Sequence, residues 1–578
     1  MYVLGINAAF HDSSAALVKD GRIIAAAEEE RFTHIKHGKR PLPFSTYELP
    51  FHAINYCLET AGIHLNDVDR IAYSFDPHGL EENVLHNENL RPHTNSLHGD
   101  TLIEPQVNVY KGWDELFLRY IKKAPEQLRD GYPHHLQRRF RGAVSLDKKW
   151  LFVNHHIAHA ASAYYPSPYE KAAVLTLDGR GEKATTGYFR GDGNLMTELG
   201  TVDMPHSLGM LYEKITSYLG FLHSSDEYKV MALASYGKPV YIEKFQSVIH
   251  VGEDGDYTID DFDPEEWWGI SRTKDDPFDE IHFDIAHSLQ KVLEETVLKL
   301  VHWLYTKADS ENLCMAGGVA LNCVMNAVIR DKGPFKNVWV QPAAGDSGTA
   351  LGAALWVDVN LNAHRSDSRY TAVMDHVYWG PAYTDDEIEK FMIWSKTPYR
   401  KLENVAKETA AILADNKIIA WYQGRMEFGP RSLGSRSILA SPTPPEMQTK
   451  LNDIKDREDF RPVAPVVLEE DVTDWFVGGD FSPFMLFVYP VREDKAAKIP
   501  AVRHTDGTAR VQTVNRNQHP SYYDLISEFK KLTGVPVLVN TSFNTRGEPI
   551  VCTPRDAIEC FWTSPFDALV INSFLLEK

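Results

Sequence analysis

The sequence NHHIAHA, residues 154–160, precedes an apolar run, AAVLTL at 172–177, that ends in Asp178. If the first stretch is helical, His155 and His159 lie on one face, because residues four apart stack on consecutive turns. Two imidazoles in this arrangement commonly coordinate one transition-metal ion. The apolar run is typical of a buried strand, whose carboxyl end can bring Asp178 to the same ion. The alternative is a pair of surface histidines near a turn aspartate, since HxxxH alone is a weak motif.

The composition describes a globular protein of two or more domains, because the chain has 578 residues, 43% of them hydrophobic. A formal net charge of -20 argues against non-specific nucleic-acid binding. The five cysteines form no CxxC pair, so we expect neither a disulfide framework nor a cysteine zinc site. The N-terminus is not basic and no window holds about 18 apolar residues, so we predict a cytoplasmic protein without a membrane span.

The first 150 residues begin with three expected strands, at 2–6, 15–19 and 22–27, the last two joined by a hairpin turn at Asp20-Gly21. His11 lies in the polar loop between the first two strands. A helix is expected at 48–63 and a strand at 68–74. Residues 77–145 are an irregular insert with one helix near 113–122, and inserts of this length are commonly functional.

The middle of the chain twice passes from a strand through small residues into a helix. Asp226 stands at an expected helix start, and a long amphipathic helix spans 283–306. A strand at 312–316 then leads into Gly317-Gly318 and Asn322, and a strand at 338–341 leads into residues 342–354, which include Asp346. Helix N-termini after such turns favour phosphate or nucleotide contacts, with close helix–sheet packing as the alternative.

A second unit is expected from about residue 377, after the polar stretch 358–375. A strand at 418–422 is followed by residues 423–438, which hold three arginines among glycines and serines. Guanidinium groups bind phosphate bidentately, so this segment indicates anion recognition, with an exposed surface network as the alternative. Further candidates follow along the chain: Arg431, Lys455, Arg457, Arg510, Asn540 and Ser542.

Taken together, these motifs resemble the NodU/CmcH-type O-carbamoyltransferase family over essentially the whole chain. The stretches that carry the resemblance are GINAAFHDSSAAL (5–17), AEEERF (27–32), HHIAHAASA (155–163), LDGRGE (177–182), KVMALASYG (229–237), CMAGGVALN (314–322), AAGDSGTALG (343–352), GRMEFGPRSLGSRSI (424–438), DIKDREDFRPVAP (453–465) and NTSFN (540–544). Within the family, the N-terminal half looks closest to enzymes that modify antibiotics, such as the tobramycin and ansamycin types.

The resemblance implies an α/β protein of two domains. Residues 1–360 look like an actin/sugar-kinase-like ATPase domain, similar to the tRNA threonylcarbamoyl transferase subunit; residues 361–376 are a linker, and 377–578 look like a YrdC-like α/β domain. The second domain makes carbamoyl-adenylate from carbamoyl phosphate and ATP, with magnesium. The first transfers the carbamoyl group to a hydroxyl of a small-molecule acceptor beside iron(II) or another divalent transition metal.

Residue roles follow from the same resemblance. The metal ligands map onto His155, His159, Asp178 and Asp346. Arg431, Lys455, Arg457 and Arg510 supply positive charge to the phosphates, and Asn540 and Ser542 are neutral donors. Gly317, Gly318 and Asn322 are expected to contact cofactor. His11 or Asp226 deprotonates the acceptor, and His11 needs the smaller pKa adjustment.

Three other functions compete with this interpretation. A sugar-kinase-type phosphotransferase accounts for the first domain but not for the cationic array of the second. A non-catalytic nucleotide-binding module predicts gaps in the ligand set, and none is seen. Threonylcarbamoylation of tRNA conflicts with the acidic net charge, so we do not expect a nucleic-acid partner.

Overall fold

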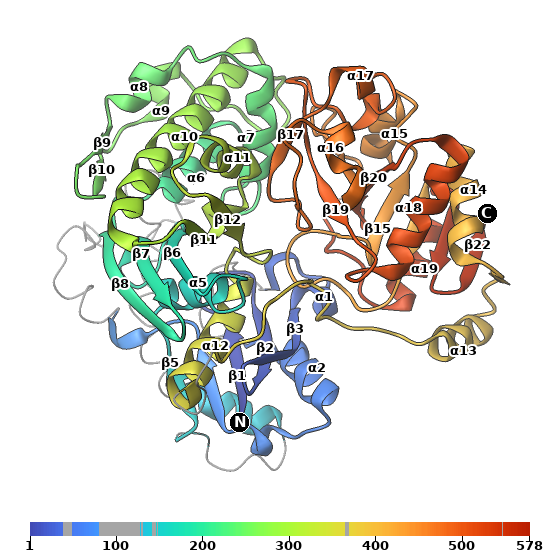
Figure 1. Cartoon of the computed structure of the whole chain (residues 1–578), viewed down its shortest axis with the longest axis horizontal. Coiled ribbons are helices and arrows are strands. Elements are labelled where there is room, and N and C mark those ends of the chain that lie inside the picture. The colour runs from blue at the N-terminus through green and yellow to red at the C-terminus, as the bar shows by residue number, and fades with distance from the viewer. Residues whose placement is uncertain are drawn as a thin grey trace, which may run out of the picture.

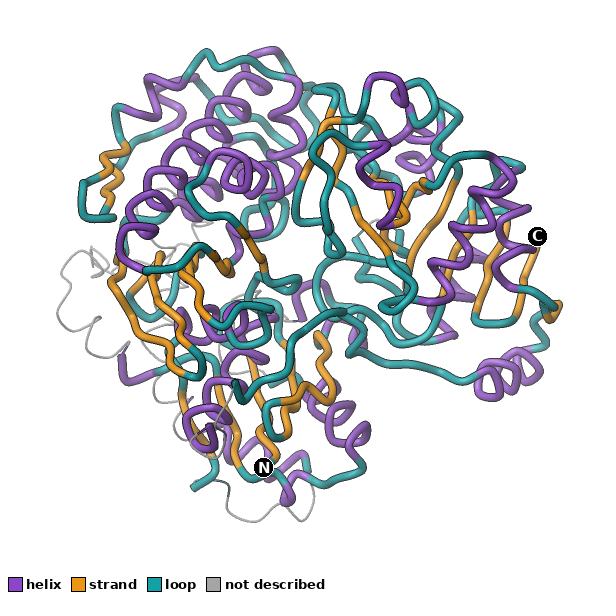
Figure 2. Tube along the Cα trace, in the orientation of Figure 1, coloured by secondary structure: helices purple, strands orange, loops and turns teal. Residues whose placement is uncertain are grey.

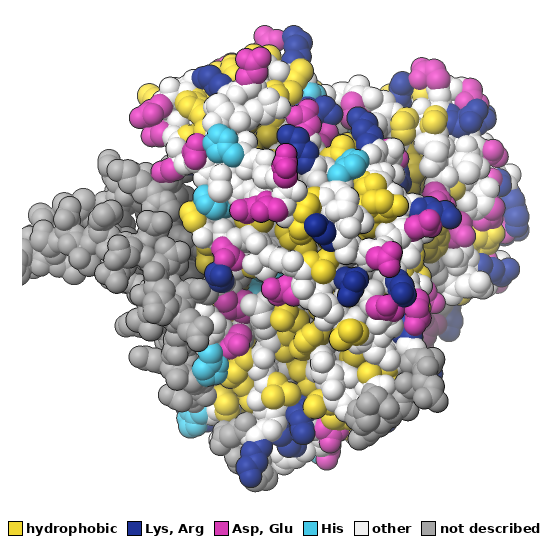
Figure 3. Space-filling model, turned by 60° about the vertical axis from the view of Figure 1, so that its left-hand side comes forward, with side chains coloured by type: hydrophobic (Ala, Val, Ile, Leu, Met, Phe, Trp, Pro, Cys, Tyr) yellow, Lys and Arg dark blue, Asp and Glu magenta, His cyan; other side chains and the backbone are white. Residues whose placement is uncertain are grey.

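The computed structural model describes residues 1–38, 49–79, 128, 131–140, 146, 148–363, 369–545 and 547–578. The helix expected at 113–122, and most of the irregular insert around it, lie outside these residues. Within them, no helix is both long enough and apolar enough to cross a membrane. Acidic, basic and apolar side chains are interspersed over the face drawn in Figure 3.

The first sheet confirms the expected N-terminal strands and the hairpin at Asp20-Gly21. Its strand order is β3-β2-β1-β4-β5. The strands are β1 (Tyr2–Asn7), β2 (Ser14–Lys19), β3 (Arg22–Glu28), β4 (Arg70–Tyr73) and β5 (Trp150–Phe152). The first three form an antiparallel meander, and β4 and β5 extend the sheet in parallel beyond β1. Helix α2 (Phe51–Ala61), expected at 48–63, packs on this sheet, and α1 (Glu30–Thr33) follows β3.

The second sheet repeats this arrangement. Its strands are β6 (Lys171–Leu177), β7 (Ala184–Asp192), β8 (Leu195–Asp203), β11 (Asn312–Ala316) and β12 (Asn337–Val340). They lie in the order β8-β7-β6-β11-β12, again an antiparallel meander extended by two parallel strands beyond its first strand. The N-terminal half is therefore built from two copies of one topology (Figure 1).

Two helices join the sheets: α5 (His155–Tyr164) packs on the second sheet, α12 (Ser347–Asn362) packs on the first, and the two pack on each other. Their approach depends on Gly352, where a Cβ atom would lie 1.8 Å from the carbonyl oxygen of Ala158. Only glycine permits such contact. Helix α12 continues to Asn362, past the start of the linker expected at 361.

Helices on the outer side of the second sheet complete the N-terminal half. They are α6 (Leu208–Tyr218), α7 (Glu227–Leu233), α8 (Ile242–Gln246), α9 (Pro264–Trp268), α10 (Glu280–Ala308) and α11 (Cys323–Lys332), with the 3₁₀ turn η5 (Gly318–Leu321) before α11 and a small ribbon of β9 (Ile249–Val251) and β10 (Tyr257–Ile259). The long helix expected at 283–306 is confirmed as α10.

The C-terminal half is one mixed sheet of eight strands covered by helices. The strand order is β13-β22-β21-β14-β15-β20-β16-β19. The strands are β13 (Arg400–Lys401), β14 (Ile419–Tyr422), β15 (Arg436–Ala440), β16 (Ala464–Leu468), β19 (Gln512–Val514), β20 (Val537–Ser542), β21 (Ala568–Ile571) and β22 (Phe574–Glu577), with β17 (Val488–Pro490) and β18 (Thr508–Arg510) in a separate ribbon. The helices are α13 (Asp385–Ser395), α14 (Val405–Ala414), α15 (Met447–Ile454), α16 (Val472–Trp475), α17 (Glu493–Ala496), α18 (Pro520–Thr533) and α19 (Pro554–Thr563).

The two halves lie side by side (Figure 2). A buried ion pair of the first half forms hydrogen bonds with the second. Arg31 Nη2 lies 3.1 Å from Glu28 Oε1 and donates to the carbonyl oxygen of Gly429 at 2.9 Å. Glu28 Oε1 in turn accepts from the amide of Gly429 at 2.9 Å. Because Gly429 belongs to the arginine-rich stretch 423–438, this contact fixes that stretch against the N-terminal half.

Candidate active site

The histidine pair lies at the start of α5, as the spacing predicted. The Asn154 side chain accepts a hydrogen bond from the amide of Ile157, which caps the helix so that His155 occupies its first turn. His155 and His159 are both fully buried, and their Nε2 atoms lie 3.2 Å apart. The intervening His156 is turned away and its Nδ1 lies 2.7 Å from Thr176 Oγ1.

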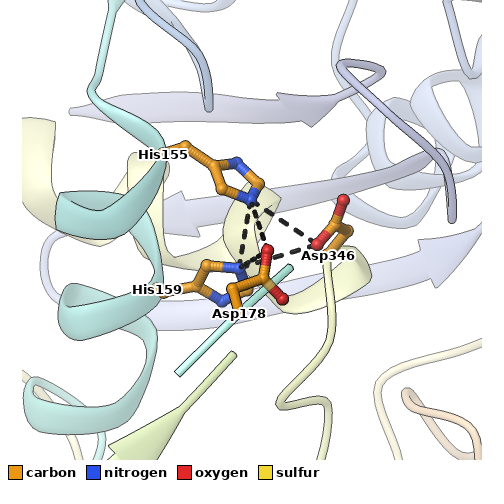
Figure 4. A group of neighbouring side chains, drawn as sticks. All are labelled: His155, His159, Asp178 and Asp346. Atoms are coloured by element: carbon orange, nitrogen blue, oxygen red, sulfur yellow. Dashed lines mark hydrogen bonds and ion pairs between the residues drawn. The ribbon is translucent and has the colours of Figure 1, made fainter. Parts of the chain in front are cut away.

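Two carboxylates complete a four-residue cluster around this pair (Figure 4). Asp178 follows β6, and Asp346 lies between β12 of the same sheet and the start of α12. His155 Nε2 lies 3.5 Å from Asp178 Oδ2 and 3.5 Å from Asp346 Oδ1. The corresponding distances from His159 Nε2 are 3.8 and 3.6 Å. One atom from each of the four side chains lies within 4.8 Å of all the others.

These spacings fit a bound divalent cation. Four ligands at bond lengths of about 2.1 Å in a tetrahedral array lie about 3.4 Å from one another. Five separations among the four atoms, 3.2 to 3.8 Å, bracket that value. Two nitrogens and two oxygens are a donor set that suits iron(II), zinc or manganese. The cluster can therefore hold a transition metal.

Hydrogen bonds around the cluster orient its members. His155 Nδ1 lies 3.2 Å from the carbonyl oxygen of Ser74, which makes Nδ1 the donor and leaves the Nε2 lone pair facing the cluster. Asp178 Oδ1 accepts from the amide of Gly318 at 2.8 Å. Glu182 accepts from the amide of His155 at 3.0 Å and from the Asn154 side chain at 2.9 Å. Glu182 was not assigned a role from the sequence, although it ends the motif LDGRGE.

Mutual attraction keeps the cluster charged despite burial. Burial lowers the pKa of His155, but Asp346 and Asp178 outweigh it and the pKa is raised well above its usual value. Burial likewise opposes ionisation of Asp178, yet the two histidines hold the pKa of that carboxyl well below its usual range. A site that favours two carboxylates in a dry interior favours a cation between them.

The two candidate bases occupy different places. His11 Nε2 lies 4.0 Å from Asp346 Oδ2, beside the cluster. Its Nδ1 lies 2.8 Å from Asp12, whose other oxygen is 2.8 Å from His37 Nδ1. Burial lowers the pKa of His11, while Asp346 and Asp12 raise it, to about 10. Asp226 instead precedes α7 and lies 3.1 Å from Lys229.

The three expected cofactor contacts of the first half lie along one turn. Gly317 has φ of +94°, and a Cβ there would lie 2.1 Å from the carbonyl oxygen of Leu177, so it permits close packing on β6. Gly318 contacts Asp178, as described above. The Asn322 side chain caps α11 and donates to Gln290 Oε1 at 2.8 Å. Its amide group is thus engaged within the protein.

The cationic candidates of the second half lie near its boundary with the first. We call these four residues the cation cluster: Arg431, Lys455, Arg457 and Arg510. Arg431 Nη2 donates to the carbonyl oxygen of Leu321 at 3.3 Å. Lys455 Nζ donates to Ser542 Oγ at 3.2 Å. Among the described residues, no carboxylate lies within 4 Å of a nitrogen of any of the three arginines.

The cation cluster is buried without compensating charge. Burial and the neighbouring Arg510 lower the pKa of Arg431 to about 9, and burial and Arg461 do the same for Arg457. Three buried guanidinium nitrogens, Arg431 Nε, Arg457 Nη2 and Arg510 Nε, have no hydrogen-bond partner. Buried polar groups are normally satisfied, so this arrangement indicates a site for an anion.

Two neutral residues border the cation cluster. Asn540 donates to Gln512 Oε1 at 2.7 Å, while its own Oδ1 is buried without a partner. Ser542, at the end of β20, is held between Lys455 and Asn544 Oδ1, which accepts from its hydroxyl at 2.7 Å. The second half thus brings Asn540 and Ser542 to the same strand end as Lys455.

One short segment touches both clusters. The amide of Gly318 donates to Asp178, and the carbonyl oxygen of Leu321 accepts from Arg431. Burial lowers the pKa of Arg510, and the nearby Cys323 thiol opposes part of that change. Five residue steps span at most about 18 Å of extended chain. The four-residue cluster and the cation cluster are therefore close neighbours across the boundary between the halves.

Comparisons with known proteins agree with the arrangement in two halves. The family model described as carbamoyltransferase N-terminus matches residues 2–355, and that described as carbamoyltransferase C-terminus matches residues 410–578. The uncharacterized protein sll1178 of Synechocystis sp. is 40% identical over 620 residues, covering 100% of this chain and 97% of the relative. Nodulation protein NolNO of Sinorhizobium fredii is 39% identical, covering 99% and 80%.

Among solved structures, component A of (R)-2-hydroxyglutaryl-CoA dehydratase from Acidaminococcus fermentans matches 62% of this chain and 99% of its own, with 14% identity and a TM-score of 0.34. The family models together span most of the sequence and leave residues 356–409 between them. The chain belongs to the carbamoyltransferase family.

Proposed function

We propose that this protein is an ATP-dependent O-carbamoyltransferase that makes carbamoyl-adenylate from carbamoyl phosphate and ATP, then transfers the carbamoyl group to a hydroxyl of a small-molecule acceptor. The observation that carries the proposal is the pairing of two complementary clusters: buried, unpaired guanidinium groups in one half and a His₂Asp₂ cation site in the other. On the resemblance described above, the acceptor is an antibiotic or a glycoside.

The domain assignment has support of two kinds. The repeated order of an antiparallel meander extended by two parallel strands is the arrangement expected for an actin/sugar-kinase-like ATPase domain over residues 1–360. A YrdC-like C-terminal domain over 377–578 rests on the sequence resemblance and on the cationic array.

The adenylating step would use the cation cluster. Carbamoyl phosphate loses its phosphate to water, and an oxygen of the resulting carbamate attacks the α-phosphorus of ATP, which releases pyrophosphate. Arg431, Arg457 and Arg510 offer unpaired donors for the phosphate oxygens, and Lys455 and Ser542 lie at the end of β20 to orient the carbamoyl group. The negative charge that develops in this step meets donors that are already in place.

The transfer step would use the four-residue cluster. His155, His159, Asp178 and Asp346 would hold a divalent metal, which would supply Lewis acidity there. The acceptor oxygen bonds to the carbonyl carbon, the bond to the phosphate oxygen breaks, AMP leaves, and the hydroxyl proton passes to His11 Nε2. A cation on Asp346 neutralises part of the charge that raises the pKa of His11, which favours the neutral imidazole that a base requires.

The direct test is exchange of labelled pyrophosphate into ATP that depends on carbamoyl phosphate and magnesium, combined with a mass-spectrometric screen of hydroxylated scaffolds for a gain of one carbamoyl group. AMP and pyrophosphate are the expected products. ADP as product supports a sugar-kinase-type reaction instead, and the absence of any nucleotide turnover supports a non-catalytic module. Lys455→Met should lose exchange, and added carbamoyl-adenylate should restore transfer in that variant.

A further inference from the structure

Helix α7 lies near both clusters, and its first three residues contact different neighbours. Glu227 faces the first half: its Oε1 accepts from the amide of Ser224 at 2.6 Å. Burial and Glu213 raise the pKa of Glu227 to about 8, and His11 is near enough to oppose that change. Tyr228 faces the second half, where the guanidinium of Arg461 lies 4.9 Å from its ring centre. Successive helical residues point about 100° apart, so one turn serves both sides.

Lys229, the third of these residues, bridges the halves. Its Nζ lies 3.1 Å from Asp226 of its own half and 3.1 Å from Glu458 of the other, which are 14% and 27% exposed. The second oxygen of Glu458 lies 3.3 Å from Arg461 Nη1. Acidic and basic groups therefore alternate across the boundary, and the chain of pairs ends at Tyr228.

An aromatic contact fixes the same segment of the second half. The ring of Phe460 lies 5.6 Å from that of Phe278 and 6.4 Å from that of Phe221, in edge-on geometry. Tyr236 donates its hydroxyl to the carbonyl oxygen of Phe460 at 3.3 Å. Edge-on aromatic pairs of this kind are favourable contacts. The turn after α15, which supplies Lys455 and Arg457, is thereby held against the N-terminal half.

We infer that Lys229, Glu458 and Phe460 are positioning residues that close the boundary beside α7, so that an activated intermediate made at the cation cluster reaches the four-residue cluster without escaping to solvent. This inference rests on the proposed function. The physical reason for the inference is that a carbamoyl–phosphate mixed anhydride hydrolyses in water. Water must therefore be excluded while the intermediate moves from one cluster to the other. Segment 318–323 contacts both clusters, and α7 contacts residue 458 of the second half beside them.

The contact between Lys229 and Glu458 is suited to a closure rather than to global stability. Lys229 and Glu458 are 15% and 27% exposed, and ion pairs that water reaches add little to the free energy of folding. The pair is one of several contacts that hold the boundary closed, and losing it shifts the ratio of closed to open arrangements by about fivefold. The effect should therefore appear in retention of the intermediate and not in thermal unfolding.

The test measures escape of the intermediate and needs no acceptor. Enzyme is incubated with ATP, carbamoyl phosphate and magnesium; exchange of labelled pyrophosphate into ATP reports adenylation, and mass spectrometry of an ultrafiltrate reports released carbamoyl-adenylate. Lys229→Met and Glu458→Gln should leave exchange within about twofold of wild type and raise the released share about fivefold. The double variant should leak no more than the leakier single variant, because both changes remove one contact.

Phe460→Leu tests the aromatic contact in the same way. Lys238→Met is the matched control: it removes a lysine from an ion pair, with Glu280, that lies wholly within the first half and is 72% and 77% exposed. Lys229→Arg keeps the charge and should keep the intermediate.

An unchanged released share in Lys229→Met and Glu458→Gln overturns the inference, as does an equal rise in Lys238→Met. A rise that is matched by a fall in exchange or by early thermal unfolding also overturns it, because the residues would then serve folding alone. If the wild-type protein shows no pyrophosphate exchange that depends on carbamoyl phosphate, the proposed function is wrong, and this inference is refuted together with it.

Discussion

Replacing His159 by alanine should remove metal from the first half and leave adenylation in the second half intact. His159 contributes one of four ligand atoms whose mutual spacing matches a tetrahedral metal site. Even changes to residues that only orient a ligand lower metal affinity by about 10- to 100-fold. Loss of a ligand itself should therefore cost at least about 100-fold, or about 2.7 kcal/mol.

A matched control lies on the same helix. His156 is 1% exposed and His159 is fully buried, so alanine at either position removes the same volume from a packed interior. Each change should destabilise the fold by a similar amount, about 2–4 kcal/mol. Only His159 has its Nε2 in the four-residue cluster, whereas His156 contacts Thr176. Any difference in metal binding between the two variants thus reports ligation.

The assay is anaerobic titration of iron(II) into chelator-treated protein, with metal per chain measured after gel filtration. Wild type and His156→Ala should bind one metal per chain, and His159→Ala should bind at least about 100-fold more weakly. Exchange of pyrophosphate into ATP should be equal in all three. Equal loss of metal in both variants would refute the ligand assignment, and loss of exchange in His159→Ala would refute the separation of the two sites.

Three further predictions concern residues around the four-residue cluster. Glu182→Gln, which weakens the acceptor for the His155 amide, should lower metal affinity by about 10- to 100-fold in the same titration, and unchanged affinity would count against an orienting role. Burial, His155 and His159 lower the pKa of His156 to about 3. Between pH 3 and 6.5 the unfolded chain therefore binds a proton at His156 that the folded chain does not, so the free energy of unfolding falls as the pH drops below 6.5. His156→Asn should reduce this loss of stability, which is measured as the difference between urea unfolding at pH 5 and at pH 7. An unaltered pH dependence would contradict this. Gly317→Ala forces a Cβ against Leu177 and should cost about 1–3 kcal/mol by the same unfolding assay, with a neutral result contradicting it.

The local part of the site could be predicted from sequence. The spacing of His155 and His159 fixes a shared helix face wherever that helix lies, and Asp178 follows from its place at a strand end. The place of Asp346 beside them came from resemblance, because no local rule brings a residue 168 positions after Asp178 to the same point. Asn322 stays a prediction: the strand and glycine turn suggest a cofactor contact, and the structure adds that its side chain caps α11, as an asparagine before a helix commonly does.

Contacts between distant segments could not be predicted. Glu182 matters because the turn after β6 returns to the first residue of α5, and Lys229 matters because Glu458 approaches from the other half. Neither pairing has a spacing or a composition that marks it. The motifs KVMALASYG and DIKDREDFRPVAP hold Lys229 and Glu458 without revealing that the two residues meet at the boundary between the halves, since a boundary is a property of tertiary packing.

The charges at that boundary explain why the two halves depend on each other. The four-residue cluster keeps two carboxylates ionised in a dry interior, and the cation cluster keeps three guanidinium groups there with no carboxylate partner among the described residues. On the proposed function each arrangement is costly until its ligand binds, and the ligands have opposite sign: a cation for the first and phosphate oxygens for the second. Because Gly318 and Leu321 tie the clusters together through one turn, neither site can relax this charge by moving apart from the other. Unrelaxed charge of this kind is what makes a site preorganised for a reaction in which charge develops.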